Sequence, residues 1–161
     1  MTGRAHTVRT VTIGDAAVAP MMAELTAEYT RRYGAEAAAR EMAGYPDSDF
    51  AAPHGAVLLL EHAGLPVAGG AFRRKDAHTA ELKRIWTAAA HRRRGHGRRI
   101  VAALETAAAA RGYRHVYLST GPAQPEAVAL YRRLGYALLD GEGTAPDGGR
   151  HYYAFAKTLP A

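Results

Sequence analysis

The chain has 161 residues, and its 48% hydrophobic content is enough for a folded core, which excludes a globally disordered protein. It carries 21 lysines and arginines against 15 acidic residues, a formal charge of +6, and it has no cysteine. The missing cysteine excludes a disulfide scaffold, a thiolate metal site and a cysteine nucleophile. No apolar run reaches the roughly 20 residues of a membrane span, and Met1–Thr10 lacks the apolar segment of a secretion signal. We therefore expect one cytoplasmic domain over residues 1–161.

Hydrophobic spacing and turn residues predict strands and helices along the whole chain. Apolar alternation and β-branched residues indicate strands, whereas apolar residues repeated every three to four positions and ended by glycine indicate helices. In chain order we predict a strand at 8–13, helices at 15–32 and 36–43, a loop at 45–55, strands at 56–61, 67–74 and 79–87, a helix from 95 to 111, a strand at 115–119, a helix at 125–134, and strands at 136–139 and 151–159. In the strand at 79–87, the pattern places Ala80, Leu82 and Trp86 on one face. The order predicts an α/β fold with a mixed sheet flanked by helices.

Arginine is concentrated in one short segment. Six of the arginines lie between Arg84 and Arg99, and most of them belong to a loop that follows the third central strand and opens a helix. Gly95 and Gly97 let a ligand approach the backbone, and the free amides at a helix N-terminus attract anions. Cations at that end of a helix would otherwise be unfavourable. The segment therefore predicts a phosphate-binding loop, with a solvated basic surface as the simpler alternative.

Two motifs resemble those of the GCN5-related N-acetyltransferases, the GNAT family. The first is RxxGxG at residues 92–97, which is similar to the motif that binds the pyrophosphate of acetyl-CoA in that family. The second is QxxAxxLYxxxGY at residues 124–136, where the family usually begins with asparagine. The resemblance extends over about residues 8–159. It implies a mostly antiparallel GNAT-like sheet splayed at its central strand, acetyl-CoA as cofactor, and direct transfer of the acetyl group to an amine.

The resemblance implies a set of cofactor-binding residues. They belong to the loop, to the end of the strand before it, where a backbone amide usually holds the thioester carbonyl, and to the second motif. The set is Ile85, Trp86, Thr87, Arg92, Arg93, Arg94, Gly95, His96, Gly97, Arg98, Arg99, Gln124 and Tyr131. For Trp86 the alternative is a core anchor.

Tyr131 and Glu81 are the catalytic candidates. A phenol is a suitable proton donor to a departing thiolate, and Tyr131 occupies the motif position that many family members use in this way. The alternative for Tyr131 is a core aromatic. Glu81 resembles the catalytic glutamate of the family's histone acetyltransferases, and a carboxylate can take a proton from an ammonium group. The alternative for Glu81 is an ion pair with Lys83 on the same strand face.

The acceptor is expected on the opposite side of the splayed sheet from the cofactor. The candidate substrate-binding residues are Tyr29, Tyr33, Arg73 and Glu81. Tyrosine and arginine side chains suit a small amine that bears a carboxylate, or an aromatic acceptor. We predict a small-molecule, peptide or protein amine as acceptor, no metal, and neither a nucleic acid nor a membrane as partner, and we leave a homodimer open. Two alternatives are an acyl-CoA-binding sensor without catalysis and a basic nucleic-acid-binding protein.

Overall fold

The computed structural model describes residues 5–161, so residues 1–4, the start of the segment in which no secretion signal is expected, lie outside the described residues. The described chain forms seven strands and four α-helices in the predicted order. The strands are β1 (His6–Val11), β2 (Ala56–His62), β3 (Leu65–Asp76), β4 (Thr79–Thr87), β5 (His115–Thr120), β6 (Ala137–Leu138) and β7 (Tyr153–Thr158). The helices are α1 (Ala19–Tyr33), α2 (Ala35–Ala43), α3 (His96–Ala110) and α4 (Pro125–Arg133).

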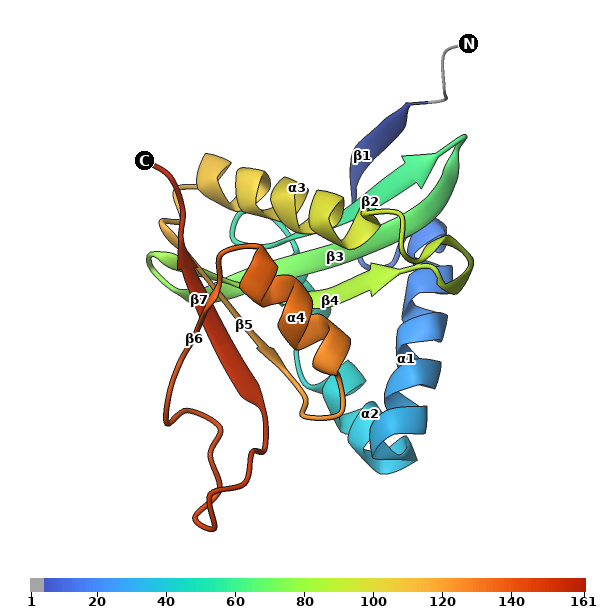
Figure 1. Cartoon of the computed structure of the whole chain (residues 1–161). Helices are drawn as coiled ribbons and strands as arrows, with labels where there is room; N and C mark the ends of the chain where they lie inside the picture. The colour runs from blue at the N-terminus through green and yellow to red at the C-terminus, as the bar shows by residue number, and fades with distance from the viewer. Residues whose placement is uncertain (1–4) are drawn as a thin grey trace.

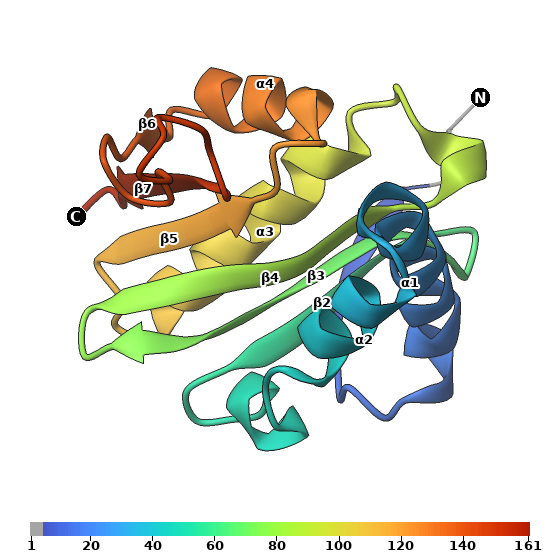
Figure 2. The ribbon, with the colours of Figure 1, turned by 90° about the horizontal axis from the view of Figure 1, so that it is seen from below.

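The strands form one sheet in the order β1-β2-β3-β4-β5-β7-β6. Neighbouring strands are antiparallel except for β4 and β5, which run parallel. Helices α1 and α2 cover one face of the sheet, and α3 and α4 cover the other (Figure 1, Figure 2). The predicted α/β fold, with a mixed and mostly antiparallel sheet flanked by helices, is confirmed.

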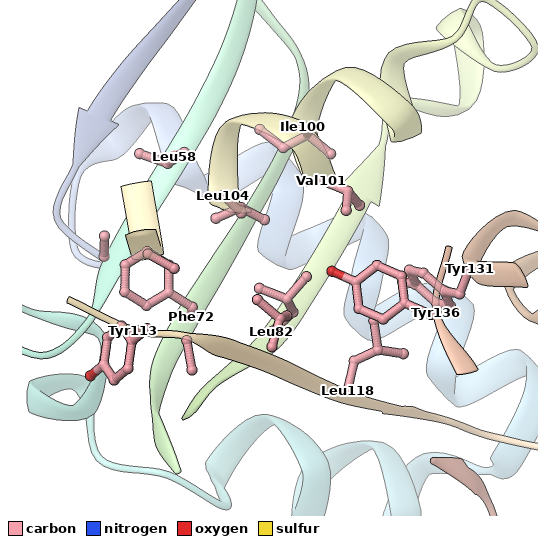
Figure 3. Packing of buried hydrophobic residues seen from close by; sticks show 14 of the residues in the cluster. Leu58, Phe72, Leu82, Ile100, Val101, Leu104, Tyr113, Leu118, Tyr131 and Tyr136 are labelled. Carbon is pink, nitrogen blue, oxygen red and sulfur yellow. The ribbon is translucent and has the colours of Figure 1, made fainter. Parts of the chain in front are cut away.

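Strand alternation divides the core into two clusters, one on each face. On β2, Leu58 belongs to the cluster shared with α3, whereas Leu59 belongs to the cluster shared with α1. Figure 3 shows the first cluster, to which Phe72 of β3 and Leu104 of α3 both belong. Both side chains are fully buried.

Two adjacent glycines of β3 let α1 and α3 approach the sheet closely. A Cβ at Gly70 would lie 2.7 Å from Leu104 Cδ1 of α3, and a Cβ at Gly69 would lie 2.7 Å from Met21 Sδ of α1. Neither distance is compatible with an undisturbed side chain. The Gly-Gly pair therefore fixes how both helices pack on the central strands.

The first helix begins later than the sequence indicates. Asp15 caps a separate 3-10 turn at Ala16–Val18, where its carboxylate accepts a hydrogen bond of 2.9 Å from the amide of Ala17. Helix α1 then begins at Ala19, with Pro20 in its first turn, where a missing amide proton costs nothing. Other boundaries differ by one to a few residues, as at β3, which continues to Asp76.

The parallel strands β4 and β5 stay together only at one end. They pair from Thr79 with His115 to Glu81 with Tyr117, and no further pairs follow among the described residues. Beyond that point the two strands diverge toward α1 and α4 (Figure 2). The predicted splay at the central strand is confirmed.

A β-bulge lies in β4 just beyond the splay. The register shifts so that two residues of β4, Arg84 and Ile85, lie opposite Gly70 of β3, and Arg84 has a left-handed φ of 61°. The extra residue reverses the alternation of side chains along the strand. Ile85 therefore packs on the α3 face with Leu82, whereas Trp86 packs on the α1 face. The prediction that Leu82 and Trp86 share a face is wrong for this reason.

Candidate functional site

Two adjoining cavities lie where β4 and β5 diverge. One, which we call the arginine cavity, has a volume of about 600 Å³ and is lined by the loop before α3 together with α1 and α4. The other, which we call the tyrosine cavity, has a volume of about 510 Å³ and reaches toward α2, β5 and the residues before β7. The residues that line both are Leu25, Tyr29, Ile85, Thr87, Gly97, Gln124, Glu126 and Leu130. The cavities therefore meet at the end of β4.

The loop before α3 presents backbone amides to the arginine cavity. Gly95 precedes the helix with a left-handed φ of 79°, and no side chain caps the first turn of α3. The first amides of a helix have no intrahelical acceptor, so they can bind an anion. A Cβ at Gly97 would lie 3.3 Å from Leu130 Cδ2, so a larger residue there would crowd the junction between α3 and α4.

Cations exceed carboxylates in the lining of the arginine cavity. Glu28 and Glu126 are its two carboxylates, and the five arginines are Arg32, Arg92, Arg93, Arg98 and Arg133. Glu28 binds both Arg32 and Arg92 at 2.9 Å, and Glu126 binds Arg32 at 2.5 Å. Within residues 5–161, Arg93, Arg98 and Arg133 have no carboxylate partner. The cavity therefore keeps three uncompensated positive charges.

Two residues of the predicted phosphate loop do not line the arginine cavity. Arg94 lies 3.1 Å from His91 Nδ1, and Arg99 donates a hydrogen bond of 3.0 Å to the carbonyl oxygen of Arg94. Arg99 also lies 3.1 Å from Nδ1 of His96, a buried residue that does line the cavity. Arg94 and Arg99 therefore hold the loop together, whereas the loop residues that line the cavity are Arg92, Arg93, Gly95, His96, Gly97 and Arg98.

The end of β4 forms the wall beside this loop. Ile85, Trp86 and Thr87 all line the arginine cavity, as expected from the sequence, and none of them pairs with β5. Trp86 is also a core residue, since it is 4% exposed and its indole N–H donates a hydrogen bond of 3.0 Å to Glu24. The core position expected as the alternative for Trp86 is thus present, and cofactor binding by its cavity-facing part stays a prediction.

Gln124 connects the loop between β5 and α4 with α1. Its side-chain oxygen accepts hydrogen bonds of 3.2 Å from the Gly121 amide and 3.3 Å from the Tyr33 hydroxyl. The same hydroxyl accepts a 3.2 Å bond from the Ala123 amide. A Cβ at Gly121 would lie 1.8 Å from the Tyr33 hydroxyl oxygen, so only glycine allows this contact. Gln124 lines both cavities, and its side-chain oxygen is already engaged in hydrogen bonds that connect α4 to α1.

Tyr131 extends from α4 into the wall of the tyrosine cavity. It is 6% exposed, and its ring packs 5.9 Å from Tyr136 and 6.1 Å from Phe155, as part of the cluster in Figure 3. Its hydroxyl has no hydrogen-bond partner within residues 5–161, unlike that of Tyr136, which donates to Glu105 at 2.7 Å. Burial raises the pKa of Tyr131 well above its usual range, so the phenol keeps its proton at neutral pH.

Glu81 and Arg73 lie outside both cavity linings. The Glu81 carboxylate is buried, 2.9 Å from Arg73 and 3.9 Å from Lys83, and Arg73 also binds Asp49 at 3.0 Å. The ion pair with Lys83, the alternative raised for Glu81, is thus present. Of the candidate acceptor residues, Tyr29 and Tyr33 line the tyrosine cavity, whereas Arg73 and Glu81 form a separate ion-pair cluster with Asp49.

Several lining residues had no site role in the sequence interpretation. Among the charged ones are Glu28 and Arg133 in the arginine cavity, and Glu41, Lys83 and Arg84 in the tyrosine cavity. Arg133 lies at the end of α4, where a cation is expected for helix stability alone, so its position gave no separate signal. The orientation of Arg84 depends on the bulge, which local sequence patterns do not reveal.

Two further features bear on the chemistry that is available. Within residues 5–161, no group of three or more histidines or carboxylates is arranged to hold a metal ion. In the same part of the chain, every helix is too short or too polar to span a membrane.

Comparisons with known structures find the same architecture in several acyltransferases. A protein from Klebsiella pneumoniae described as an acyl-CoA N-acyltransferase is 25% identical, covers 96% of this chain and 98% of its own, and has a TM-score of 0.73. An acetyltransferase from Thermus thermophilus is 23% identical, with coverage of 99% and 100% and a TM-score of 0.69. A GNAT acetyltransferase from Elizabethkingia anophelis, solved with acetyl-CoA bound, is 16% identical, with coverage of 96% and 98% and a TM-score of 0.66.

Sequence comparison gives the family. No curated protein sequence matches the chain. The family model described as "Acetyltransferase (GNAT) family" matches residues 19–136, which include both cofactor motifs, the splayed strands and the helices that line the two cavities. The chain therefore belongs to the acetyltransferase (GNAT) family, whose members are transferases that use acetyl-CoA.

Proposed function

We propose that this protein acetylates the primary amine of a small molecule or peptide, acting as one domain with acetyl-CoA as donor. The observation that carries the proposal is the meeting of two different cavities at the end of β4. The arginine cavity is suited to a polyanion, and the tyrosine cavity, which is lined by tyrosines, apolar side chains and a few charged ones, is suited to an organic acceptor.

The residues of the arginine cavity fit the phosphates of acetyl-CoA. The uncapped first turn of α3 offers amides for the pyrophosphate, and the left-handed Gly95 leaves the approach to them open. Arg93, Arg98 and Arg133 supply three charges without carboxylate partners, and arginine suits two-point binding of phosphate oxygens. We assign these groups to the phosphates, and Ile85–Thr87 of β4 to the acyl end.

The direct route follows from the residue types that the chain offers. When bound, acetyl-CoA supplies an acetyl group as a thioester. In the transfer, the N–C bond to the amine forms and the C–S bond of the thioester breaks. The nitrogen loses a proton, and a proton taken up by the sulfur neutralises the thiolate. The chain has no cysteine to carry the acetyl group in between. We therefore propose direct transfer, with donor and acceptor held together where the two cavities meet.

Tyr131 is the proposed proton donor to the sulfur. Its phenol keeps its proton at neutral pH because burial raises the pKa, and no other described residue accepts a hydrogen bond from it. Leu130, the residue before it, lines both cavities. A hydroxyl with an uncommitted proton beside that junction is suited to protonate the leaving group.

For Glu81, the ion-pair role accounts for its surroundings better than the base role. The carboxylate already binds Arg73, and it lies 3.9 Å from Lys83, which itself lines the tyrosine cavity. A base would also have to reach the acceptor amine, whereas Glu81 is buried and lines neither cavity. Glu81 as general base thus stays a prediction.

Thermal unfolding with acetyl-CoA tests the cofactor assignment first. At a hundredfold excess over Kd, binding should stabilise the protein by about 2.7 kcal/mol. Arg98→Ala should weaken this effect, whereas Arg31→Ala, which removes an exposed arginine that lines neither cavity, should not. No stabilisation by millimolar acetyl-CoA would contradict the proposal.

Thiol release from acetyl-CoA across a panel of primary amines tests the transfer itself. Binding without amine-dependent thiol release would instead favour the sensor, and tight, salt-dependent binding of DNA in the absence of acetyl-CoA would favour the nucleic-acid-binding protein. A cytoplasmic location stays a prediction, and so does the possible formation of a homodimer.

A further inference from the structure

Arg84 is a buried cation in the wall of the tyrosine cavity. Its side chain is 4% exposed, and it extends from the bulge in β4 toward the end of α2. The left-handed backbone at this position is unfavourable for a residue with a Cβ. Both the burial of this charge and the left-handed backbone of Arg84 cost free energy, so another interaction must offset these costs.

The hydrogen bonds of Arg84 go to neutral groups. Its Nη2 donates to the carbonyl oxygens of Glu41 and Met42, at 3.2 Å and 3.1 Å. Its Nη1 lies 3.8 Å from the Glu41 carboxylate, which is beyond hydrogen-bond distance. Its Nε is buried and has no partner within residues 5–161.

The two neighbouring cations of β3 and β4 are satisfied in a different way. Arg73 donates from Nε to Asp49 at 3.0 Å and from Nη1 to Glu81 at 2.9 Å, so two carboxylates bind it. Lys83 donates to the Glu41 carboxylate at 3.2 Å. Glu41 is thus already committed to Lys83, and Arg84 is the cation in this group that lacks a carboxylate at hydrogen-bond distance.

A buried guanidinium without a carboxylate at hydrogen-bond distance is costly, because two carbonyl oxygens and the Glu41 charge at 3.8 Å replace only part of its lost hydration. Burial accordingly lowers the pKa of Arg84 from its usual value. A carboxylate in the tyrosine cavity would supply a negative charge at hydrogen-bond distance, and arginine binds carboxylates with paired, parallel hydrogen bonds.

We propose that the acceptor carries a carboxylate in addition to its amine, and that Arg84 binds this carboxylate. The inference rests on the proposed function, since it concerns the acceptor of the same transfer. Ile85 follows Arg84 in the chain and lines both cavities, so an acceptor held at Arg84 lies beside their junction. The substrate class is therefore that of amino acids and related amino carboxylates.

Matched pairs of acceptors test this on the unmodified protein. The standard L-amino acids are compared with their primary amides, which keep the amine and side chain but lose the carboxylate charge. We expect at least one free acid to be acetylated with kcat/KM about tenfold or more above that of its amide. Calorimetric titration of the same pairs into the protein saturated with CoA should show the same preference in binding.

Two variants connect the preference to Arg84. In Arg84→Gln the ratio of acid to amide should fall to about one, and Arg84→Lys, which keeps the charge but loses the paired donors, should give an intermediate ratio. Arg31→Gln, on the exposed side of α1, should keep the ratio of the unmodified protein. If Arg84→Gln does not fold, the acid and amide pairs still decide the proposal on the unmodified protein.

The outcomes separate this inference from the function on which it rests. Equal use of acids and amides, acetylation restricted to amines without a carboxylate, or no binding of any amino acid would overturn the carboxylate site while amine acetylation stands. An unchanged ratio in Arg84→Gln would leave Arg84 as a C-terminal cap of α2 only. Absence of acetyl-CoA binding would overturn the proposed function itself.

Discussion

Glu28 of α1 and Arg92 of the loop before α3 form an ion pair inside the lining of the arginine cavity, with 2.9 Å between Oε2 and Nη2. The same carboxylate binds Arg32 through its other oxygen, also at 2.9 Å. A negative charge therefore lies within a cavity that we assign to phosphates, and it engages one of the arginines available to them. Glu28 thus competes with the cofactor for Arg92.

Replacing Glu28 with glutamine should strengthen acetyl-CoA binding. The variant removes a carboxylate from the phosphate cavity and frees Arg92, while Arg32 keeps Glu126 as its partner. A charge–charge term of about 0.5–1 kcal/mol corresponds to a Kd that is roughly two- to fivefold lower, with a larger effect at low salt. Calorimetric titration at two salt concentrations measures this.

Glu36→Gln is the matched control for this prediction, because Glu36 forms a similar ion pair with Arg40 on the exposed side of α2 and lines neither cavity. Its Kd should equal that of the unmodified protein. Weaker binding by Glu28→Gln would mean that Glu28 instead holds Arg92 in the position that the phosphates require.

Replacing Glu81 with glutamine decides between its two roles. If the carboxylate serves the ion pairs, its loss leaves Arg73 and Lys83 with less compensation and should lower the free energy of unfolding by about 3 kcal/mol, with kcat unchanged. Asp49→Asn removes the other carboxylate that binds Arg73 and should act in the same direction. Urea unfolding and steady-state rates measure both. A large fall in kcat in Glu81→Gln alone would assign the base role to Glu81.

Local patterns predict the glycine-containing loop and the helix after it, but not the direction of each arginine. The glycines, the strand before them and the helix after them are adjacent in sequence, so their arrangement follows from short-range rules. Arg93 and Arg94 are neighbours, yet Arg93 lines the arginine cavity and Arg94 lies against His91. Arg93 has a left-handed φ of 65°, which no residue type at this position reveals.

The acceptor side depended on contacts that are distant in sequence. The bulge at Arg84 follows from the pairing of β4 with β3, and the partner that fixes Arg73 is Asp49, 24 residues away. Alternation along a strand placed Glu81 beside Lys83, which the structure confirms at 3.9 Å. It could not show that Arg73 binds Glu81 more closely, because that contact depends on the register between two strands.

Removing the hydroxyl of Tyr131 should affect catalysis and leave stability nearly unchanged. In Tyr131→Phe we expect kcat to fall by about 100-fold or more, as for loss of a general acid, with acetyl-CoA binding retained. The free energy of unfolding should change by less than about 1 kcal/mol, because the hydroxyl has no protein partner among the described residues.

Tyr136→Phe provides the comparison for Tyr131→Phe. It removes the hydrogen bond to Glu105, so it should lower stability by about 1–2 kcal/mol and leave kcat unchanged. Steady-state kinetics and urea unfolding of both variants distinguish the two tyrosines. Full activity in Tyr131→Phe would exclude it as the proton donor.

The buried tyrosines should make the protein less stable at alkaline pH. Burial raises the pKa of Tyr131 and of Tyr136 above the value of about 10 that a tyrosine has in the unfolded chain. Below pH 10 both states are protonated, and above it the unfolded state loses protons first. Stability should therefore fall by up to about 1.4 kcal/mol per pH unit for each such tyrosine. Urea unfolding between pH 9 and 11.5 measures how steeply the free energy of unfolding falls with pH. In Tyr131→Phe this fall should be smaller by the contribution of one tyrosine. Equal slopes for the two proteins would contradict the raised pKa of Tyr131.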